Sequence, residues 1–160
     1  MTTPVDRPRF GTAGLRATVG DGPGQLHAGV VRAVADGWAA HLVRTEPDVT
    51  TVGVVVGRDA RRGSEEFAAV LCDRLGRAGV PVHRFDGPVP TPLVAGAVLR
   101  LGAAGAAMVT ASHNPPADNG IKLYGRDGVL VGSPEDAEVE AAVAAADAAP
   151  PPAAPTTGTV

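Results

Sequence analysis

Short apolar stretches alternate with amphipathic stretches along most of this chain, and this alternation restricts the fold more than any other feature. Residues 51–57, 80–85 and 105–111 are predicted to be strands, and the first and third are apolar enough to lie in a sheet covered on both faces. Alternating strands and helices predict an α/β fold with three layers, α/β/α, around a mostly parallel mixed sheet. A C-terminal antiparallel hairpin, residues 120–132, is expected to add an edge to this sheet.

Four helices are predicted from apolar residues that recur every three or four positions. They are expected at residues 25–45, 64–78 and 91–101, and from residue 133 onward. Trp38 lies on the apolar stripe of the first helix and is expected in the core, and Cys72 flanks the stripe of the second, as a packed thiol would. Thr91 and Ser133 are expected to cap the third and fourth helices, because each precedes a proline.

The composition favours a single domain and argues against nucleic acid as a partner. With 160 residues, 44% of them hydrophobic, the chain can bury one core, which we expect to involve residues 1–148. The proline-rich residues 149–160 are expected to be a linker or tail. A net charge of −3 without a run of Lys or Arg gives no basic surface for a polyphosphate backbone.

The sequence favours a cytoplasmic protein. No apolar run approaches the roughly 20 residues that a membrane-spanning helix needs. The first ten residues do not have the pattern of a secretory signal, and the single Cys72 cannot form an internal disulfide. A membrane partner is therefore not expected.

Ser112 is the best candidate for a reacting atom. It follows a predicted buried strand and enters a turn stiffened by Pro115 and Pro116, and such rigidity suits a nucleophile. A simple Asn-Pro turn explains the same residues equally well. His113 could act as a base or hydrogen-bond donor, or it could merely be solvated. Because neighbouring residues of an extended chain point to opposite sides, Ser112 and His113 are not expected to form a hydrolase dyad.

Two cations could serve a phosphoryl group on this serine. Arg16 and Lys122 would neutralise its charge if the fold brings them to Ser112, and phosphoryl transfer depends mostly on positioning and electrostatics. Both could equally be ordinary surface residues.

Four further residues are expected to bind phosphate or to support the site. Thr110 and Asn114 flank the serine. Asp59 and Arg61 follow another predicted strand and are either a structural ion pair behind the site or direct ligands, and we favour the supporting role.

Two other sequence patterns do not indicate a functional site. Residues 20–25 imitate a glycine-rich nucleotide loop but match neither common phosphate-loop motif, so a turn is expected there. The four histidines and the single cysteine lack zinc-ligand spacing, so no structural metal is expected.

Three motifs in order resemble the α-D-phosphohexomutase superfamily, which includes phosphoglucomutases and phosphomannomutases. "TASHNP" (residues 110–115) resembles the phosphoserine signature of that family, "FGTAGLR" (residues 10–16) its N-terminal motif, and "DNGIKLY" (residues 118–124) the segment after the active serine. The likeness covers residues 9–147 and corresponds to the first of the four domains of the family.

This resemblance implies a phosphosugar mutase, an isomerase that moves a phosphoryl group between the 1-position and the 5- or 6-position of a sugar phosphate through a sugar bisphosphate. Ser112 would carry the phosphoryl group and offer an oxygen to Mg²⁺. Arg16 and Lys122 would act in proton transfer and phosphate stabilisation, and His113 would lie beside the phosphoserine as a hydrogen-bonding or proton-handling group.

The sequence also departs from the family. The Asp-rich loop that supplies the other Mg²⁺ ligands is absent, as are the sugar-recognition loop and the phosphate-binding domain. An isolated first domain with little or no turnover is therefore expected, and the missing domains are possible partners. In the N-terminal motif, Ala13 replaces the serine that is common in the family. The same replacement is associated with a branch that includes phosphopentomutase and glucose 1,6-bisphosphate synthase, so the sequence does not decide between a hexose and a pentose substrate.

Two other functions remain open. A non-catalytic module could use the same loops to bind a sugar phosphate or a partner chain. A phosphohydrolase, in which water intercepts the phosphoserine, is a more distant alternative.

Overall fold

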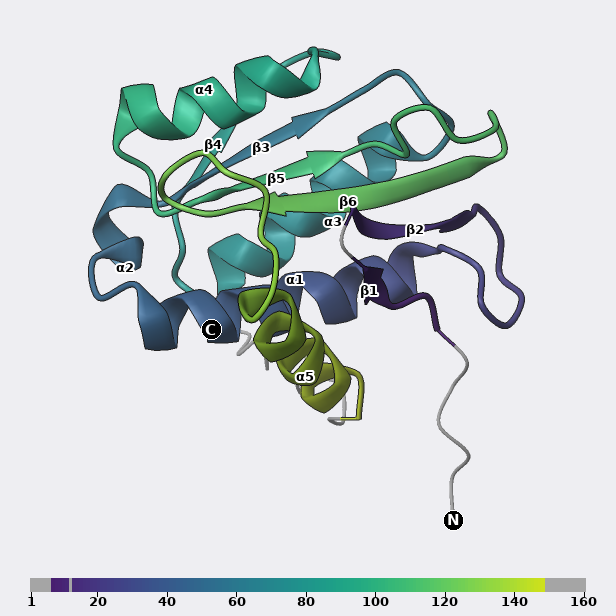
Figure 1. Cartoon of the computed structure of the whole chain (residues 1–160), viewed down its shortest axis with the longest axis horizontal. Helices are drawn as coiled ribbons and strands as arrows, with labels where there is room; N and C mark the ends of the chain where they lie inside the picture. Colours follow the sequence, from purple (N-terminus) through teal and green to yellow (C-terminus); the bar gives the residue numbers. More distant parts are fainter. Residues whose placement is uncertain (1–6, 12, 149–160) are drawn as a thin grey trace, which may run out of the picture.

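The structure, a computed structural model, describes residues 7–11 and 13–148 (Figure 1). The expected linker 149–160 lies outside these residues. The strands are β1 (Phe10–Gly11), β2 (Gly14–Thr18), β3 (Val54–Arg58), β4 (Val82–Arg84), β5 (Ala106–Val109) and β6 (Asp118–Tyr124). The helices are α1 (Ala28–Thr45), α2 (Val49–Val52), α3 (Ser64–Arg77), α4 (Thr91–Leu101) and α5 (Glu135–Ala148). Within the described residues, no helix is both long and apolar enough to span a membrane.

One mixed sheet holds the six strands in the order β1-β2-β6-β5-β3-β4. β3 pairs in parallel with β4 and β5, whereas the pairings β5 with β6, β6 with β2 and β2 with β1 are antiparallel. Four strands, β2 to β5, therefore run in one direction, which agrees with the expected mostly parallel mixed sheet. The expected place of the hairpin is wrong, because β6 lies inside the sheet and its return arm forms only a bridge, Tyr124 to Leu130.

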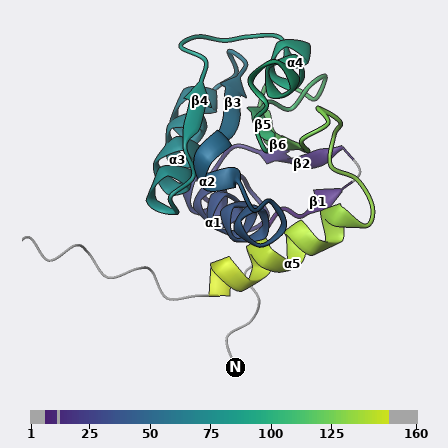
Figure 2. The ribbon, with the colours of Figure 1, turned by 90° about the vertical axis from the view of Figure 1, so that its left-hand side faces the viewer.

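Helices cover both faces of the sheet and give the expected three layers. α4 lies on one face, α1 and α3 lie on the other, and α5 packs on the outer side of α1 (Figure 2). The larger core lies between the sheet and α1 and α3, and Trp38 is 1% exposed within it. A smaller core lies under α4 around Val94, Val98 and Met108. Trp38 is therefore a core residue, as its position on the apolar stripe predicts.

Several element boundaries differ from those expected. α1 begins at Ala28, where the side chain of His27 accepts a hydrogen bond from the N–H of Gly29 at 3.1 Å. β3 begins at Val54, because the preceding residues form α2. The expected cap of α4 is wrong, since Pro90 is the N-cap and Thr91 is already helical. The expected cap role of Ser133 is not observed either, because α5 begins two residues later, at Glu135.

Cys72 is half-buried against the larger core, as a packed thiol should be. Burial raises the pKa of its thiol, and the positive charge of Arg84 lowers it by a smaller amount. The thiol is thus less easily ionised than a free cysteine, which disfavours a nucleophilic role.

Candidate active site

The loop between β5 and β6 presents Ser112 to solvent. Ser112 is exposed and has a φ of 59°, the only positive φ of a non-glycine residue among those described. Its N–H donates to the buried hydroxyl of Thr110 at 2.9 Å, and the N–H of Asn114 donates to the carbonyl of Ala111 at 3.1 Å. The chain therefore turns sharply as soon as the strand ends and directs the serine out of the core.

The left-handed backbone at Ser112 corrects the expected geometry of its neighbour. Ser112 Oγ lies 3.4 Å from Nδ1 of His113, so the two side chains do not point to opposite sides. The expectation assumed an extended chain, which a φ of 59° excludes. The contact is long for a hydrogen bond. It nevertheless brings the imidazole beside the serine hydroxyl.

The register of β2 and β6 places Arg16 and Lys122 on the same side of the sheet. Arg16 lies opposite Gly120, two residues from Lys122, and side chains two residues apart on a strand share a face. A Cβ on Gly120 would collide with the carbonyl oxygen of Leu15 and would approach Cγ of Arg16 to 3.0 Å, so the glycine lets β2 and Arg16 lie close to β6. The position of Arg16 beside Lys122 thus depends on a residue without a side chain.

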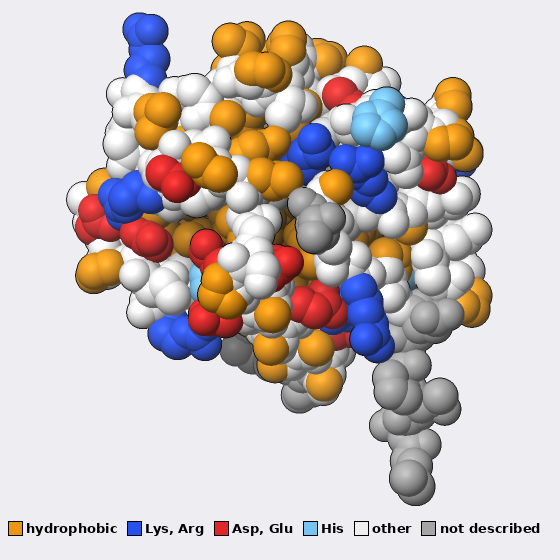
Figure 3. Space-filling model, viewed as in Figure 1, with side chains coloured by type: hydrophobic (Ala, Val, Ile, Leu, Met, Phe, Trp, Pro, Cys, Tyr) orange, Lys and Arg blue, Asp and Glu red, His pale blue; other side chains and the backbone are white. Residues whose placement is uncertain are grey.

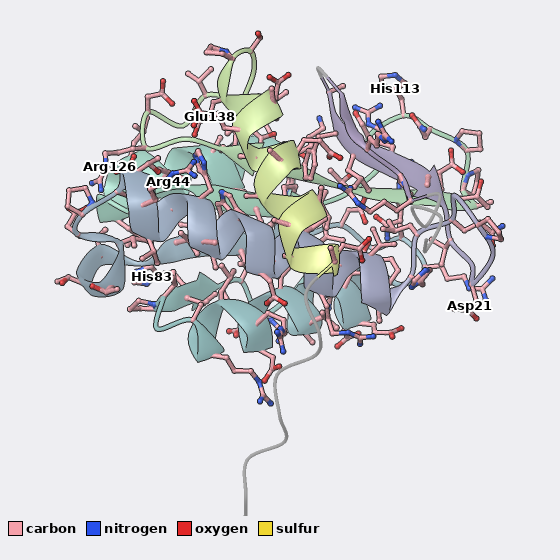
Figure 4. All side chains as sticks on the ribbon, turned by 90° about the horizontal axis from the view of Figure 1, so that it is seen from below. Asp21, Arg44, His83, His113, Arg126 and Glu138 are labelled. Atoms are coloured by element: carbon pink, nitrogen blue, oxygen red, sulfur yellow. The ribbon has the colours of Figure 1, made fainter. Side chains whose placement is uncertain are left out.

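Arg16 also reaches the serine loop. Its Nη1 donates to Oδ1 of Asn114 at 3.0 Å, and its Nη2 donates to the carbonyl of Ala13 at 3.4 Å. On the face shown in Figure 3, blue Lys or Arg side chains lie beside a pale-blue histidine, and in Figure 4 nitrogen-bearing side chains gather near the labelled His113. Arg16 therefore connects the side of the sheet that carries Lys122 to the serine loop.

The surroundings of Lys122 alter the ionisation of its ammonium group. Burial lowers the pKa of its ammonium from the ordinary 10.5, and the positive charge of Arg16 lowers it further. A half-buried cation beside a second cation favours an anionic ligand, which would relieve their repulsion. A lowered pKa also makes the neutral amine available for proton transfer nearer to neutral pH.

The altered pKa of Lys122 can be measured directly, because it is the only lysine in the sequence. In protein labelled with ¹⁵N-lysine, we expect the Nζ resonance to titrate with a midpoint below 10.5. Since the unfolded chain then holds this proton more tightly than the folded chain, the free energy of unfolding should rise as pH increases from that midpoint to 10.5. Arg16→Gln should restore only part of the shift, because burial is the larger cause.

Arg32→Gln is the matched control for this titration. Arg32 is an exposed arginine on α1 and should leave the midpoint unchanged. A midpoint at or above 10.5 in the unsubstituted protein would contradict the expectation.

Arg61 and Asp59 lie behind the serine loop as an ion pair. Nε of Arg61 is 3.4 Å from Oδ2 of Asp59, and Oδ1 of Asp59 accepts hydrogen bonds from the N–H of Arg61 at 2.9 Å and from Oγ of Ser64 at 2.6 Å. The guanidinium also donates to backbone carbonyls of the loop that carries Ser112. Of the two roles left open by the sequence, this geometry favours the supporting one.

Three residues near the loop were not identified as candidates from the sequence. Asp118 accepts hydrogen bonds from Thr18 at 2.8 Å and from Asn114 at 3.1 Å, and so joins β2 to the serine loop. Ser64 and Asn119 are fully buried and hydrogen-bonded to each other at 2.9 Å. In the sequence, the polar pair Asp118 and Asn119 directly before the apolar part of β6 could have indicated these two residues.

The described residues do not make a complete site for a divalent cation. They contain no group of three or more His, Cys, Asp or Glu side chains that could hold a metal ion. Ser112 offers a single oxygen, and the carboxylate of Asp118 is already engaged by Thr18 and Asn114. Mg²⁺ takes six oxygen ligands, several of them water, and is usually held by one or two carboxylates. The donor set of these residues therefore does not fit Mg²⁺ by itself.

The segment of residues 86–88 lies apart from the serine. It follows β4, which pairs with β3 on the side away from β5. Within the part of the chain that the structure describes, no hydrogen bond joins it to the Ser112 loop.

Comparison with known proteins places the chain among phosphosugar mutases. Residues 7–150 match the model of the phosphoglucomutase/phosphomannomutase α/β/α domain I. The protein named "Probable phosphoribomutase" of Schizosaccharomyces pombe is 40% identical over 84% of this chain and 23% of its own length. The phosphoglucomutase of Staphylococcus haemolyticus is 38% identical over 83% of this chain and 23% of its own length.

The fold agrees with the same assignment. A solved structure from Thermus thermophilus, described as a putative phosphomannomutase, has a TM-score of 0.78 at 36% identity, and the match covers 89% of this chain and 30% of that chain. This chain thus spans 23% of the length of the two curated relatives. The resemblance inferred from the three motifs is confirmed. The chain belongs to the phosphoglucomutase/phosphomannomutase family and corresponds to its α/β/α domain I.

Proposed function

We propose that this chain is the phosphoserine-bearing first domain of a cytoplasmic phosphosugar mutase, with Ser112 as the phosphoryl carrier. One observation supports this role above the others. The Ser112 hydroxyl is exposed, and Arg16, which lies on the same side of the sheet as Lys122, is hydrogen-bonded to the loop of the serine. A doubly charged phosphate ester needs such neutralisation.

The proposed step transfers one phosphoryl group from a sugar bisphosphate to the serine. Oγ of Ser112 forms a bond to phosphorus while the bond from phosphorus to the sugar oxygen breaks. The proton of the hydroxyl leaves through His113 or Lys122 and finally reaches the sugar oxygen. The reverse step returns the group to the other end of the sugar, so the serine is restored after each cycle. Arg16 and Lys122 stabilise the charge that spreads over the phosphoryl oxygens.

The class of sugar is proposed from the relatives. One relative is named for ribose and another for glucose, so both a pentose phosphate and a hexose phosphate are supported. The phosphoribomutase is the more similar of these two, and ribose phosphates are therefore the first substrates to test.

Catalysis is proposed to need parts beyond the described residues. The remaining Mg²⁺ ligands and the sugar contacts would come from the other domains, as the resemblance implies. Bound Mg²⁺ would neutralise charge on the phosphoserine. We therefore expect the chain alone to accept a phosphoryl group but to turn over little or no sugar phosphate.

Intact mass spectrometry tests the proposal. After incubation with ribose 1,5-bisphosphate or glucose 1,6-bisphosphate and Mg²⁺, the chain should gain one phosphoryl group, mapped by peptide sequencing to Ser112. Inorganic phosphate should not accumulate. Steady release of phosphate would instead indicate the phosphohydrolase.

A non-catalytic module is the second candidate, in which the exposed Ser112 loop and Arg16 would bind a sugar phosphate without turnover. In that case, the chain should bind a sugar phosphate without forming any covalent adduct. Binding measured by calorimetry and an unchanged mass would together support it.

A further inference from the structure

Four N–H groups of the Arg61 guanidinium donate to carbonyls within this chain, and Nε lies in an ion pair with Asp59. Nη1 donates to the carbonyls of Pro115 at 2.8 Å and Asp118 at 3.1 Å, and Nη2 donates to those of Ser112 at 2.7 Å and Asn114 at 2.8 Å. Nε faces Asp59 at 3.4 Å. A guanidinium has five N–H donors and no acceptor. The two Nη atoms of Arg61 can therefore bind a phosphate only if they give up part of the loop.

The four carbonyls belong to one short segment, and their convergence needs a cation. Carbonyl oxygens that point toward a common centre repel one another, and the charged, planar guanidinium satisfies them together. Ser112 is one of the four residues, and it is also the residue with the left-handed backbone. This conformation is unfavourable for a residue with a Cβ and persists only where its surroundings fix it.

Arg61 is itself held by a buried polar network. Asp59 accepts hydrogen bonds from the N–H of Arg61 and from Ser64, and Asn119 donates to Ser64 at 2.9 Å and to the carbonyl of Arg62 at 3.0 Å. Ser64 and Asn119 are fully buried. The network joins the end of β3, the start of α3 and the start of β6, which are rigid parts of the fold.

We propose that Arg61, held by Asp59 and by the buried Ser64 and Asn119, is a positioning residue that fixes the Ser112 loop so that the serine hydroxyl faces the substrate. Its action is on the backbone of the carrier loop and not on the phosphate. The catalytic part of this proposal rests on the proposed function of Ser112. The structural part, that Arg61 holds the loop in its left-handed conformation, does not.

Arg61→Gln tests both parts. Heteronuclear ¹⁵N relaxation should show new fast motion at Ser112, His113 and Asn114, while the amides of β3, β5 and β6 keep their order. The rate of Ser112 phosphorylation at saturating sugar bisphosphate should fall about a hundredfold, as expected when a reacting atom is misplaced by about 1 Å. The dissociation constant for the bisphosphate should change by less than about threefold, because both Nη atoms of Arg61 are already occupied by loop carbonyls.

Arg61→Lys and Arg62→Gln complete the series. An ammonium keeps the charge but offers three donors from one atom, so Arg61→Lys should keep the fold and give an intermediate rate. Arg62 is the exposed neighbour whose side chain forms no hydrogen bond or ion pair among the described residues, and Arg62→Gln should match the unsubstituted protein. This comparison separates the loss of the loop contacts from the loss of charge.

Two outcomes would overturn the proposal. Unchanged relaxation of the loop in Arg61→Gln would show that the arginine does not hold it. A tenfold weaker affinity with an unchanged maximal rate would make Arg61 a phosphate ligand. If the unsubstituted chain takes up no phosphoryl group, the proposed function fails, and the relaxation data still decide whether Arg61 fixes the loop.

Discussion

Ser112→Ala should abolish the covalent uptake of phosphate by this chain. The substitution removes the only atom that is proposed to accept the phosphoryl group, and none of the surrounding groups can take its place as an oxygen nucleophile on the same turn. Thr110, the nearest hydroxyl in the chain, is buried and already accepts a hydrogen bond from the N–H of Ser112. Intact mass after incubation with a sugar bisphosphate and Mg²⁺ should therefore show the unmodified protein alone.

Loss of the adduct should not come from unfolding. Ser112 is exposed, and among the residues that the structure describes its hydroxyl makes only the long contact to His113, so the free energy of unfolding should change by about 0.5 kcal/mol or less. Ser133→Ala is the matched control, because Ser133 is also exposed but lies after β6, on the far side of the hairpin. It should take up phosphate normally. An adduct that persists in Ser112→Ala would exclude this serine as the carrier.

The sequence predicts the layers of this fold well because they depend on local periodicity. The apolar residues of α1 recur every fourth position, and the valines of β3 form a continuous run, so each element can be identified from neighbouring residues alone. β1 and β2 were not predicted, since their short segments contain glycines and show no alternation. They become strands because β2 pairs with β6, about a hundred residues away, and no local pattern records that pairing.

The same non-local pairing explains the error in the place of the hairpin. Its first arm, β6, is apolar on the side that faces α1. Before the sheet forms, the backbone N–H and C=O groups along both edges of this strand need a partner. β5 takes one edge and β2 takes the other, so the strand becomes internal. A chain without β2 would leave that edge open, as the prediction assumed.

The site illustrates a different limit of sequence reasoning. The motifs place Ser112, Arg16 and Lys122 among the candidates. The sheet register places Arg16 and Lys122 on the same side of the sheet, and Arg16 reaches the serine loop through Asn114. The expected directions of the Ser112 and His113 side chains were wrong, because they depend on a single backbone angle. The carbonyl contacts of Arg61 could not be predicted at all, since they depend on the path of a loop and not on residue types.

Trp38→Ala should destabilise the fold more than any substitution at the candidate site. Trp38 is 1% exposed and lies in the core between the sheet and α1, the helix that also carries α5 on its outer side. Removing a buried aromatic side chain of this size costs about 3–5 kcal/mol, because the lost burial is accompanied by a cavity that the neighbours fill only partly. Domains of this kind have a total stability of about 5–15 kcal/mol, so much of it would be lost.

The free energy of unfolding is measured in urea by circular dichroism. Tryptophan fluorescence cannot be used, because the variant lacks the only tryptophan. Val43→Ala is the matched control on the same helix, because Val43 is 50% exposed and should change the free energy of unfolding by about 0.5 kcal/mol or less. A loss below about 1 kcal/mol for Trp38→Ala would mean that the indole is not a packed part of the core. Because Trp38 is remote from Ser112 in its contacts, the folded fraction of this variant should still take up phosphate, whereas Ser112→Ala should remain folded and take up none.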